Sequence, residues 1–393
     1  MTLDLDKSTW KRVTLGEVAA ASKDKVDPSD GSVERYVAGE HMYTDDLKLH
    51  SWGDPSEVDL GPAFHRRFRP GQVLYGSRRT YLRKVAVADF HGVCANTTFV
   101  VETREPGVLL QAFLPFVMSS EPFHAFAIAE SKGSVNPYVN WSDIVRFEFD
   151  LPPLDLQRRL ADLLWSVQRH KLALRSAEME AETTRSAWLH SLFAEAEEST
   201  GFVELDSLIA DGRPICYGVL KPGPEFEGGL QIVDVKDYPD RRIRLQTVRR
   251  CDPQIEAQFA RSRLRAGDVL LSIRGTIGRV AVVPEELNGQ NISRDSARIS
   301  GDPAKVLPEF LRLILESPDV QREIRRATTG LAVKGINVAR IRTLAVPNWA
   351  IARQQEAVAT HGRIQEAVDV LAAELQSLSR LQSSLLAEIF GGP

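Results

Sequence analysis

The sequence has little of what builds disulfide frameworks, zinc sites or membrane spans. Its 393 residues include only three cysteines, Cys94, Cys216 and Cys251, which are odd in number, widely spaced and never arranged as Cys-x-x-Cys. We therefore expect buried, unpaired thiols and no metal site. No stretch approaches the roughly 18 uncharged apolar residues that a membrane-spanning helix needs, and residues 1–11 are polar. These absences predict a cytoplasmic protein without a membrane partner.

Motifs for covalent chemistry are also scarce. The sequence contains no P-loop, no Gly-x-Ser-x-Gly elbow and no His-x-x-x-His pair. Residues 136–138 (Asn-Pro-Tyr) approach the catalytic tetrapeptide of DNA methyltransferases, but they lack its second proline and a matching glycine-rich loop upstream. Residues 234–236 (Asp-Val-Lys), following Asp211, have only a weak spacing for a nuclease carboxylate cluster. The sequence predicts no catalytic residue.

What the chain does have is a long internal repeat. Residues 70–80 contain Pro-Gly-Gln-Val-Leu followed by an arginine and a threonine, and residues 266–276 contain Ala-Gly-Asp-Val-Leu with the same two residues at equal offsets. The shift of 196 residues holds to within one residue further on, where Asn140 matches Asn337 and Gln157 matches Gln354. Matches that keep the same offset over so many residues predict two copies of a folded unit, each far longer than a solenoid repeat.

The composition is that of an ordinary folded chain, at 43% apolar and 26% charged residues, and the net charge is −4. This balance argues against a protein that coats nucleic acid indiscriminately. The charge is uneven, however, because residues 66–84 carry seven Lys and Arg residues and no carboxylate. Local basic surface on a nearly neutral protein favours selective binding of a polyanion, although a solvated charged face would give the same run.

Each copy begins with short β-like runs punctuated by glycine, proline and aspartate, which favours an α/β (α+β) domain. Residues 267–274 and 278–283 are typical of two strands joined by a glycine turn. Such a hairpin would present Arg274, Thr276 and Arg279 near its tip.

A proline signal and a long helical pattern follow each copy. After Pro152 and Pro153, apolar positions recur from Leu156 to Trp188 in alternating steps of four and three residues, passing through His170 and Thr184. After Pro347 the same spacing gives a second seam. Its members are Ala357, His361, Ile364, Val368, Leu371, Leu375, Leu378, Gln382, Leu385 and Ile389. Because a 3.5-residue period keeps one stripe toward a partner helix, we expect the two helices to pair, with the polar seam residues setting register.

Connectivity favours an antiparallel coiled coil, because a compact second domain must return the chain to the end of the first helix. The predicted organisation is target domain 1 at 1–152, spacer helix 1 at 153–199, target domain 2 at 200–347 and spacer helix 2 at 348–393. Some 40 helical residues would span roughly 60 Å, close to two turns of duplex DNA at about 34 Å each.

The loops of both copies are rich in groups that contact DNA. Arginine pairs with guanine, asparagine pairs with adenine, lysine holds phosphate, and tyrosine stacks or contacts a thymine methyl. The candidates are Arg78, Arg79, Tyr81, Arg83, Lys132, Ser134, Asn136, Tyr138 and Asn140 in the first copy, and Arg274, Thr276, Arg279, Arg294, Lys334 and Asn337 in the second. Each alone is as well explained as a surface or turn residue, so the prediction depends on their repeated placement.

These features together resemble the specificity (S) subunits of type I restriction-modification systems. The resemblance is carried by residues 267–281 and their counterpart at 71–81, by the loops at 131–134 and 329–331, and by the Leu-Pro-Pro-Leu-x-x-Gln entry to the first helix. It covers nearly the whole chain. The second helix entry departs from the pattern, with a single Pro347 before Asn348 and Trp349.

The resemblance implies two target-recognition domains that each read half of a bipartite site in double-stranded DNA, in the service of phage defence. It implies that two methyltransferase (M) subunits dock on the helices, and Gln157, Leu160, Gln354 and Gln355 are the candidate partner-binding residues. It leaves open whether restriction (R) subunits also join. S-adenosylmethionine, ATP and magnesium would belong to partner subunits, and this chain would hold no cofactor. The alternatives are a stand-alone DNA methyltransferase or nuclease fused to its own reader, and a scaffold that binds no DNA.

Overall fold

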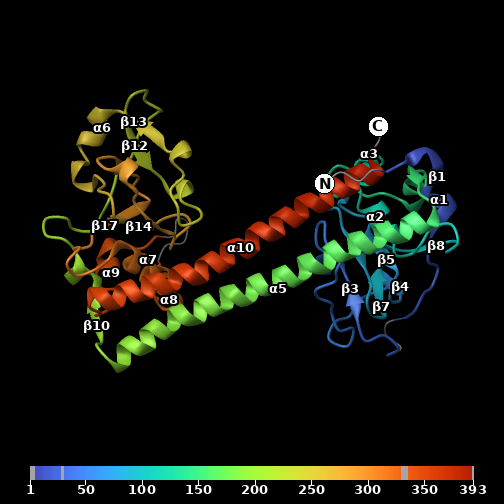
Figure 1. Ribbon diagram of the computed structural model, residues 1–393, viewed down its shortest axis with the longest axis horizontal. Helices are drawn as coiled ribbons and strands as arrows, with labels where there is room; N and C mark the ends of the chain where they lie inside the picture. The colour runs from blue at the N-terminus through green and yellow to red at the C-terminus, as the bar shows by residue number, and fades with distance from the viewer. Residues whose placement is uncertain (1–4, 28–30, 329–334, 392–393) are drawn as a thin grey trace. The chain divides into compact units, whose positions relative to one another are not determined.

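The computed structural model describes residues 5–27, 31–328 and 335–391 (Figure 1). The chain divides into two compact units. Unit 1 comprises Met1–Arg175 and Ala373–Pro393, and unit 2 comprises Ser176–Ala372. Each unit therefore contains one globular domain together with part of each of two long helices, α5 (Leu154–Glu198) and α10 (Ile351–Phe390).

Unit 1 contains three small sheets. A four-stranded antiparallel sheet has the order β2 (Ala19–Ala21), β8 (Thr98–Thr103), β5 (Val73–Gly76), β6 (Val85–Val87). A three-stranded sheet has the order β3 (Tyr36–Val37), β7 (Gly92–Ala95), β4 (Phe64–Phe68), with β3 and β7 parallel. The third sheet pairs β1 (Lys11–Thr14) with β9 (Glu148–Leu151), which brings the start of the domain to the residues that precede α5.

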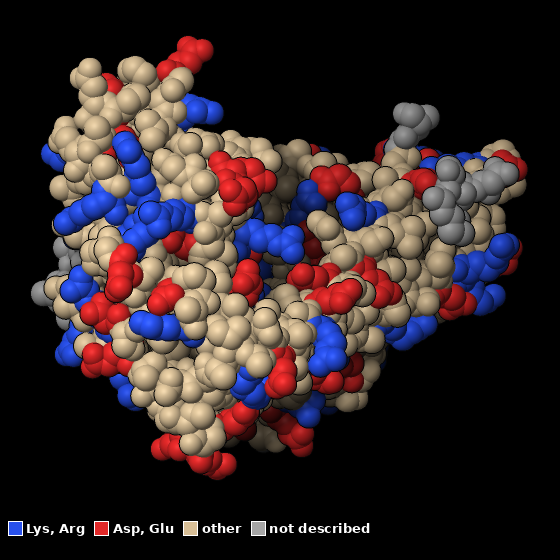
Figure 2. Space-filling model, turned by 60° about the vertical axis from the view of Figure 1, so that its left-hand side comes forward, with Lys and Arg blue, Asp and Glu red and all other residues tan. Residues whose placement is uncertain are grey.

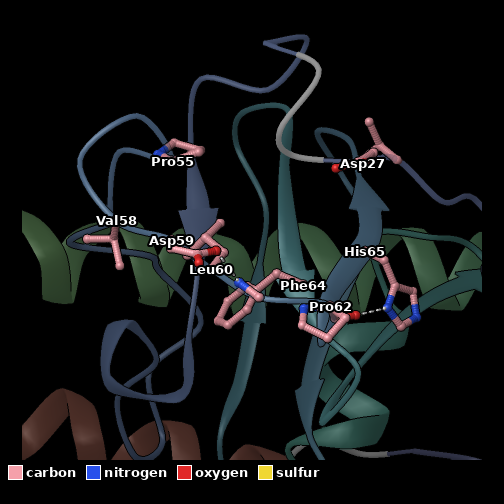
Figure 3. Close-up of a pocket in the computed structure, with 10 residues that line it drawn as sticks. Asp27, Pro55, Val58, Asp59, Leu60, Pro62, Phe64 and His65 are labelled. Carbon is pink, nitrogen blue, oxygen red and sulfur yellow. Dashed lines mark hydrogen bonds between the residues drawn. The ribbon is translucent and has the colours of Figure 1, made fainter.

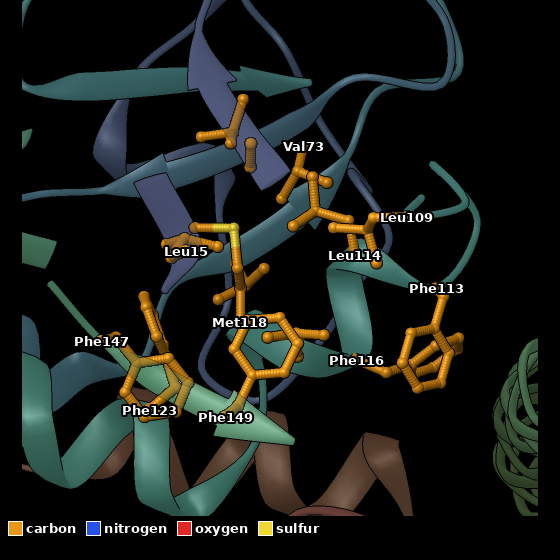
Figure 4. Packing of buried hydrophobic residues seen from close by; sticks show 14 of the residues in the cluster. Leu15, Val73, Leu109, Phe113, Leu114, Phe116, Met118, Phe123, Phe147 and Phe149 are labelled. Atoms are coloured by element: carbon orange, nitrogen blue, oxygen red, sulfur yellow. The ribbon is translucent and has the colours of Figure 1, made fainter. Parts of the chain in front are cut away.

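Short helices cover the four-stranded sheet of unit 1. They are α1 (Leu15–Val18), α2 (Leu114–Met118), α3 (Glu121–Ala129) and α4 (Trp141–Ile144), with single 3-10 turns at η1 (Lys7–Thr9), η3 (Gly39–His41) and η4 (Thr80–Leu82). The core between them includes the fully buried Phe113, Phe116 and Phe123 (Figure 4). The Phe123 ring packs edge-on against Phe147, which stacks on Phe149. Apolar residues of α5 and α10 belong to the same core, so this domain is packed directly onto the helices.

Unit 2 repeats this plan. Its four-stranded sheet has the order β11 (Cys216–Tyr217), β17 (Ser296–Ile299), β14 (Val269–Ser272), β15 (Val280–Val282). Its three-stranded sheet has the order β13 (Arg249–Cys251), β12 (Leu230–Val233), β16 (Asn291–Ile292), and β10 (Phe202–Glu204) pairs with β18 (Ala345–Pro347). Its helices are α6 (Pro253–Ala257), α7 (Pro308–Glu316), α8 (Pro318–Ala327) and α9 (Val338–Arg342), with 3-10 turns at η5 (Leu205–Leu208), η6 (Val235–Asp237), η7 (Leu245–Thr247), η8 (Ala260–Ser262) and η9 (Glu285–Leu287).

The structure confirms the duplication inferred from sequence. The two four-stranded sheets share one strand order, and the predicted hairpin is formed by antiparallel pairing of β14 with β15. The matched serines Ser120 and Ser317 both cap a helix, each accepting a hydrogen bond from a backbone N–H three residues on, at 3.3 Å. The copies differ in the third strand of the smaller sheet, because β4 pairs with β7 whereas β13 pairs with β12.

The long helices pair in antiparallel fashion within each unit. In unit 2 the ring of Trp188 on α5 lies 6.0 Å from the ring of His361 on α10. Glu195, later on α5, binds Arg353, earlier on α10, at 2.6 Å. In unit 1, Lys171 Nζ donates to Gln382 Oε1 at 2.7 Å. The antiparallel coiled coil expected from the two heptad seams is confirmed.

The predicted seam is right for α10 and right in part for α5. His361, Val368, Leu385 and Ile389 are buried as expected. On α5, Leu160, Val167 and Leu174 are buried as expected. His170 and Thr184 are exposed, however, and the neighbouring Lys171 is buried in place of His170. The reason is that α5 also packs against its own domain, where Trp165 Nε1 donates to Ala112 O at 2.8 Å and the Trp165 ring lies against Phe116.

The three cysteines are free and buried, as expected. None of the helices in the described ranges is long and apolar enough to cross a membrane.

Candidate nucleic-acid interface

In unit 1, two loops that are far apart in sequence form one surface. Arg79 N donates to Pro137 O at 2.6 Å, and Arg79 Nε donates to Asn136 Oδ1 at 3.1 Å. Arg78 forms an isolated bridge with Tyr138, and Lys132 and Tyr138 exchange backbone hydrogen bonds of 2.8 and 2.9 Å. The loop after β5 and the loop before α4 are therefore held together, and they carry all nine first-copy candidates.

The first of these loops has an unusual backbone. Arg79 and Arg83 both have positive φ, at 51° and 49°, and they flank the 3-10 turn η4. This left-handed conformation is unfavourable for arginine, and such outliers persist where the surrounding structure fixes them, often at functional sites. The turn presents Tyr81 outward, with 53% of its surface exposed.

The cations of this surface differ in their freedom to bind an anion. Arg83 binds Glu121 at 2.7 Å, and Lys132 binds Asp143 at 2.9 Å. Arg78 is exposed and has no ion pair among the described residues. Ser134 and Asn140 are exposed as well, and Asn140 is the N-cap of α4. Arg78 is consequently the cation best placed to contact a base edge, whereas Arg83 and Lys132 also stabilise the loops.

Unit 2 forms the equivalent surface. Arg274 forms a bridge with Gly335, at the repeat position of the bridge between Arg78 and Tyr138, and Ile336 N donates to Ile273 O at 3.0 Å. Arg274 and Thr276 are exposed. In unit 2 the described end of the second loop, at Gly335 and Ile336, thus meets the loop after β14 as its counterpart does in unit 1.

The remaining second-copy candidates are less uniform. Arg279 Nη1 donates to Val235 O at 3.1 Å, and Arg294 is exposed beside Asp295, at 3.7 Å. Asn337 accepts a hydrogen bond from Ala339 N and caps α9, so it has a structural use of its own. Lys334 lies outside the described residues.

The candidate partner-binding glutamines are placed differently from what we expected. Gln157 is 1% exposed: its Oε1 accepts from Leu110 N at 2.9 Å, and its Nε2 donates to Val108 O and Pro152 O. Gln354 is 2% exposed and makes the same three bonds, to Leu307 N, Lys305 O and Trp349 O. These side chains fasten each helix to its own domain, so in this structure they are internal ties and not surface residues.

The other two partner-binding candidates differ in their exposure to solvent. Leu160 is 3% exposed and belongs to the unit 1 core, whereas Gln355 is exposed on α10. The departure at the second helix entry does not disturb the tie, because Gln354 makes it despite the missing proline. Only Gln355 of the four is open to a partner.

The two weak catalytic motifs have structural roles. Pro137, in the Asn-Pro-Tyr segment, accepts the Arg79 N–H described above. Asp234 caps the turn η6 and accepts from Ser293 Oγ at 3.1 Å. Among the described residues, no group of three His, Cys, Asp or Glu side chains is arranged to hold a metal ion.

A separate cavity of about 470 Å³ opens in unit 1, away from the two loops (Figure 3). It is lined by Val26, Asp27, Pro55, Val58, Asp59, Leu60, Gly61, Pro62, Phe64 and His65. His65 Nδ1 lies 3.1 Å from Pro62 O, which turns the ring along the wall. The lining is mainly apolar and includes none of the candidate DNA-binding residues.

The surface carries its charge in groups. Figure 2 shows several Lys and Arg side chains gathered on the side of the view where unit 2 comes forward, with few carboxylates among them. A clustered basic surface is one electrostatic feature of nucleic-acid-binding proteins.

Comparisons with known proteins agree on one family, although no family model matches the chain. The specificity subunit of the type I restriction enzyme EcoBI from Escherichia coli is 32% identical over 192 residues, which are 48% of this chain and 40% of that protein. The EcoDI specificity subunit of the same species is 24% identical over 153 residues, 39% of this chain and 33% of that protein. The matches thus span less than half the length of either relative.

Solved structures match over nearly the whole chain. A chain from work on the assembly and conformational transition of the type I R-M system matches with a TM-score of 0.61 and 21% identity, over 97% of this chain and 98% of that one. The type I S subunit from M. genitalium matches with a TM-score of 0.61 and 14% identity, over all of both chains. The chain is therefore similar in sequence to a type I restriction-modification specificity subunit over about half of its length, and it shares the fold of these solved chains over nearly all of it.

Proposed function

We propose that this chain is the DNA-recognition subunit of a type I restriction-modification enzyme, with each domain reading one half of a bipartite site. The observation that carries the proposal is the repeated pair of loops, which presents an exposed arginine at the same repeat position in each unit, Arg78 and Arg274. An exposed guanidinium on a fixed loop can donate two hydrogen bonds to guanine in the major groove. The likeness to the EcoBI specificity subunit supports this assignment.

The chemistry in this proposal belongs to other subunits. Two methyltransferase subunits would dock on the exposed faces of α5 and α10, and they would bind S-adenosylmethionine and modify the DNA. Restriction subunits would supply ATP-driven, magnesium-dependent cleavage where they are present. This chain would recognise the DNA sequence and hold no cofactor.

Mapping genomic methylation with and without this gene tests the proposal. We expect a methylated motif in two parts with an unread gap, which disappears on deletion. An unsplit motif, or one that survives deletion, would contradict it. Turnover by the isolated chain with DNA, magnesium and S-adenosylmethionine would instead support a stand-alone enzyme.

Single substitutions test the division of labour between the domains. Arg78→Ala should relax one half of the motif and Arg274→Ala the other, each at a cost of about 1 to 3 kcal/mol where the side chain meets a base edge. Arg12→Ala is the matched control, because Arg12 is an exposed arginine on β1 that binds Glu148 and Asp150. Uniform weakening over all sequences would make Arg78 or Arg274 a phosphate contact instead.

A further inference from the structure

A second basic surface lies in unit 1, outside the two loops. It is a groove of about 690 Å³ lined by Ala20, Ala21, Ser22, Lys23, Asp24, Lys25, His65, Arg66, Phe99, Arg104 and Trp141. An adjoining hollow of about 370 Å³ is lined by Asp24, Lys25, Arg67, Phe68, Arg69 and His91. The two hollows adjoin at Asp24 and Lys25, which line both, and we call them together the β4 groove.

The β4 groove is strongly positive. Its walls carry six Lys and Arg side chains and one carboxylate, that of Asp24. Lys23, Lys25 and Arg67 are exposed, and none of them has an ion pair among the described residues. Arg69 is the exception, since it binds Glu102 at 3.0 Å. Several cations are thus available to an external anion.

Side-chain contacts hold the floor of the groove in place and connect it to the two candidate loops. Arg66 Nη1 donates to Thr98 O at 2.8 Å, and its guanidinium lies 5.2 Å from the centre of the Phe99 ring. Trp141, which directly follows Asn140, packs edge-on against Phe99. The loop after β5 is fixed to the same strand end, because Ser77 N donates to Thr97 O at 2.9 Å. The groove therefore begins where the base-reading loops end.

Unit 2 has an arginine at the position that matches Arg67, but a carboxylate of the same unit neutralises its charge. The shift of 196 residues pairs Arg67 with Arg263. Arg263 forms two bonds to the buried Glu256, at 2.9 and 2.7 Å. Close by in the same unit, Arg213 binds Asp268 at 2.6 Å. A guanidinium held by two carboxylate bonds is a poor phosphate ligand, because its best donors are already used.

We propose that the β4 groove is a phosphate track that holds the backbone of duplex DNA next to the half-site read by unit 1, and that Arg263, the unit 2 counterpart of Arg67, does not serve in this way. This inference rests on the proposed function and adds to it an asymmetry between the two recognition domains. Lys23, Lys25 and Arg67 contribute sequence-independent affinity through release of counterions. Arg78 and its neighbours carry the sequence reading.

The test uses the full complex with its methyltransferase subunits and two duplexes, one with the mapped methylation motif and one scrambled. The variant combines Lys23→Gln with Arg67→Gln, and both side chains are exposed, so the fold should be unaffected. The matched control combines Lys221→Gln with Arg261→Gln, two exposed cations of unit 2 without ion pairs in the described part of the chain. Binding is measured by fluorescence anisotropy between about 50 and 200 mM salt.

We expect the variant to lower the slope of log K against log salt by about 2, at ~0.9 for each phosphate that is no longer neutralised. It should weaken binding equally to both duplexes and leave the methylated motif unchanged, and the control should keep the wild-type slope. An unchanged slope, a changed motif or an equal loss of affinity in the control would overturn the inference. Dissociation of the methyltransferase subunits from the complex, measured by mass photometry, would assign the groove to an acidic protein surface and also overturn it.

The two proposals fail in distinguishable ways. If the wild-type complex does not distinguish the motif from the scrambled duplex, the proposed function is wrong. If it does so while the variant keeps the wild-type slope and melting temperature, only the phosphate track is wrong. Lys23→Glu with Arg67→Glu gives a second reading, since reversed charge should repel the backbone and reduce affinity further than the neutral pair.

Discussion

Replacing Gln157 with leucine should loosen the joint between α5 and the domain of unit 1. Gln157 is 1% exposed, and its side chain bonds to Leu110 N, Val108 O and Pro152 O. Leucine has a similar volume, so the substitution leaves no large cavity and removes the hydrogen bonds. The Pro152 carbonyl, whose bond to Gln157 is buried, then loses a partner that water cannot readily replace.

The expected cost follows from those groups. A buried polar group that loses its partner costs about 1 to 3 kcal/mol, and the Val108 and Leu110 bonds are only partly buried, so water offsets part of the loss. We expect about 2 to 4 kcal/mol for unit 1. At ~1.4 kcal/mol for each factor of ten, even the lower value raises the opening equilibrium at this joint by about 30-fold.

Hydrogen exchange followed by mass spectrometry measures this directly, because a chain of two units does not have a single free energy of unfolding. Peptides containing Leu110 and the start of α5 should lose protection in Gln157→Leu. Gln354→Leu should give the mirror result in unit 2, at Leu307 and the start of α10, since it breaks the same three bonds.

Gln355→Leu is the matched control, because Gln355 is exposed one residue further along α10. Its exchange should remain as in the wild type. The reasoning is refuted if Gln355→Leu costs as much as Gln354→Leu, or if Gln157→Leu leaves the Leu110 amide as protected as before.

Two further perturbations address buried groups in each unit. Burial, reinforced by nearby arginines, lowers the pKa of His124 and of His361 to about 4, so both imidazoles are neutral in the folded chain. In the unfolded chain the imidazole has a pKa of about 6.5, so as the pH falls it takes up a proton before the folded imidazole does. The free energy of unfolding should therefore be complete above about pH 6.5 and fall toward about pH 4, by up to ~3 kcal/mol for each histidine. Chemical denaturation across this range should show a weaker pH dependence in His361→Phe, and an unchanged dependence would contradict the assignment. Gly218→Ala should destabilise unit 2 by more than about 2 kcal/mol, because the new Cβ would lie 1.9 Å from the Ile292 carbonyl oxygen. Gly39→Ala is the control, since a Cβ there meets nothing within 4 Å. Equal melting temperatures for the two variants would show that the backbone at Gly218 moves freely.

Much of the architecture could be predicted from local pattern. The repeat register located the paired loops, and the proline signals located α5 and α10. The heptad seam was correct for α10 and correct in part for α5. On α5, Leu156 and Leu163 are apolar because they pack on the domain, a cause that periodicity alone does not distinguish from helix pairing.

The availability of each side chain could not be predicted in this way. Gln157 and Gln354 have the position that the family resemblance links to partner binding, yet their partners are backbone groups about 50 residues earlier in the chain. Lys23, Lys25 and Arg104 escaped notice because they are scattered in sequence, and only the folding of β4 beside them forms a groove.

By itself, the sequence determined the duplication, the two helices and the positions of the paired loops, because these depend on spacing and on local backbone preference. The tertiary structure alone decided which charges are free. Arg83 meets Glu121, Lys132 meets Asp143 and Arg263 meets Glu256, while Arg67 and Arg78 meet no carboxylate among the described residues. Ion pairing depends on distances of a few ångströms between residues that are separated along the chain, and those distances exist only once the sheets and helices have packed.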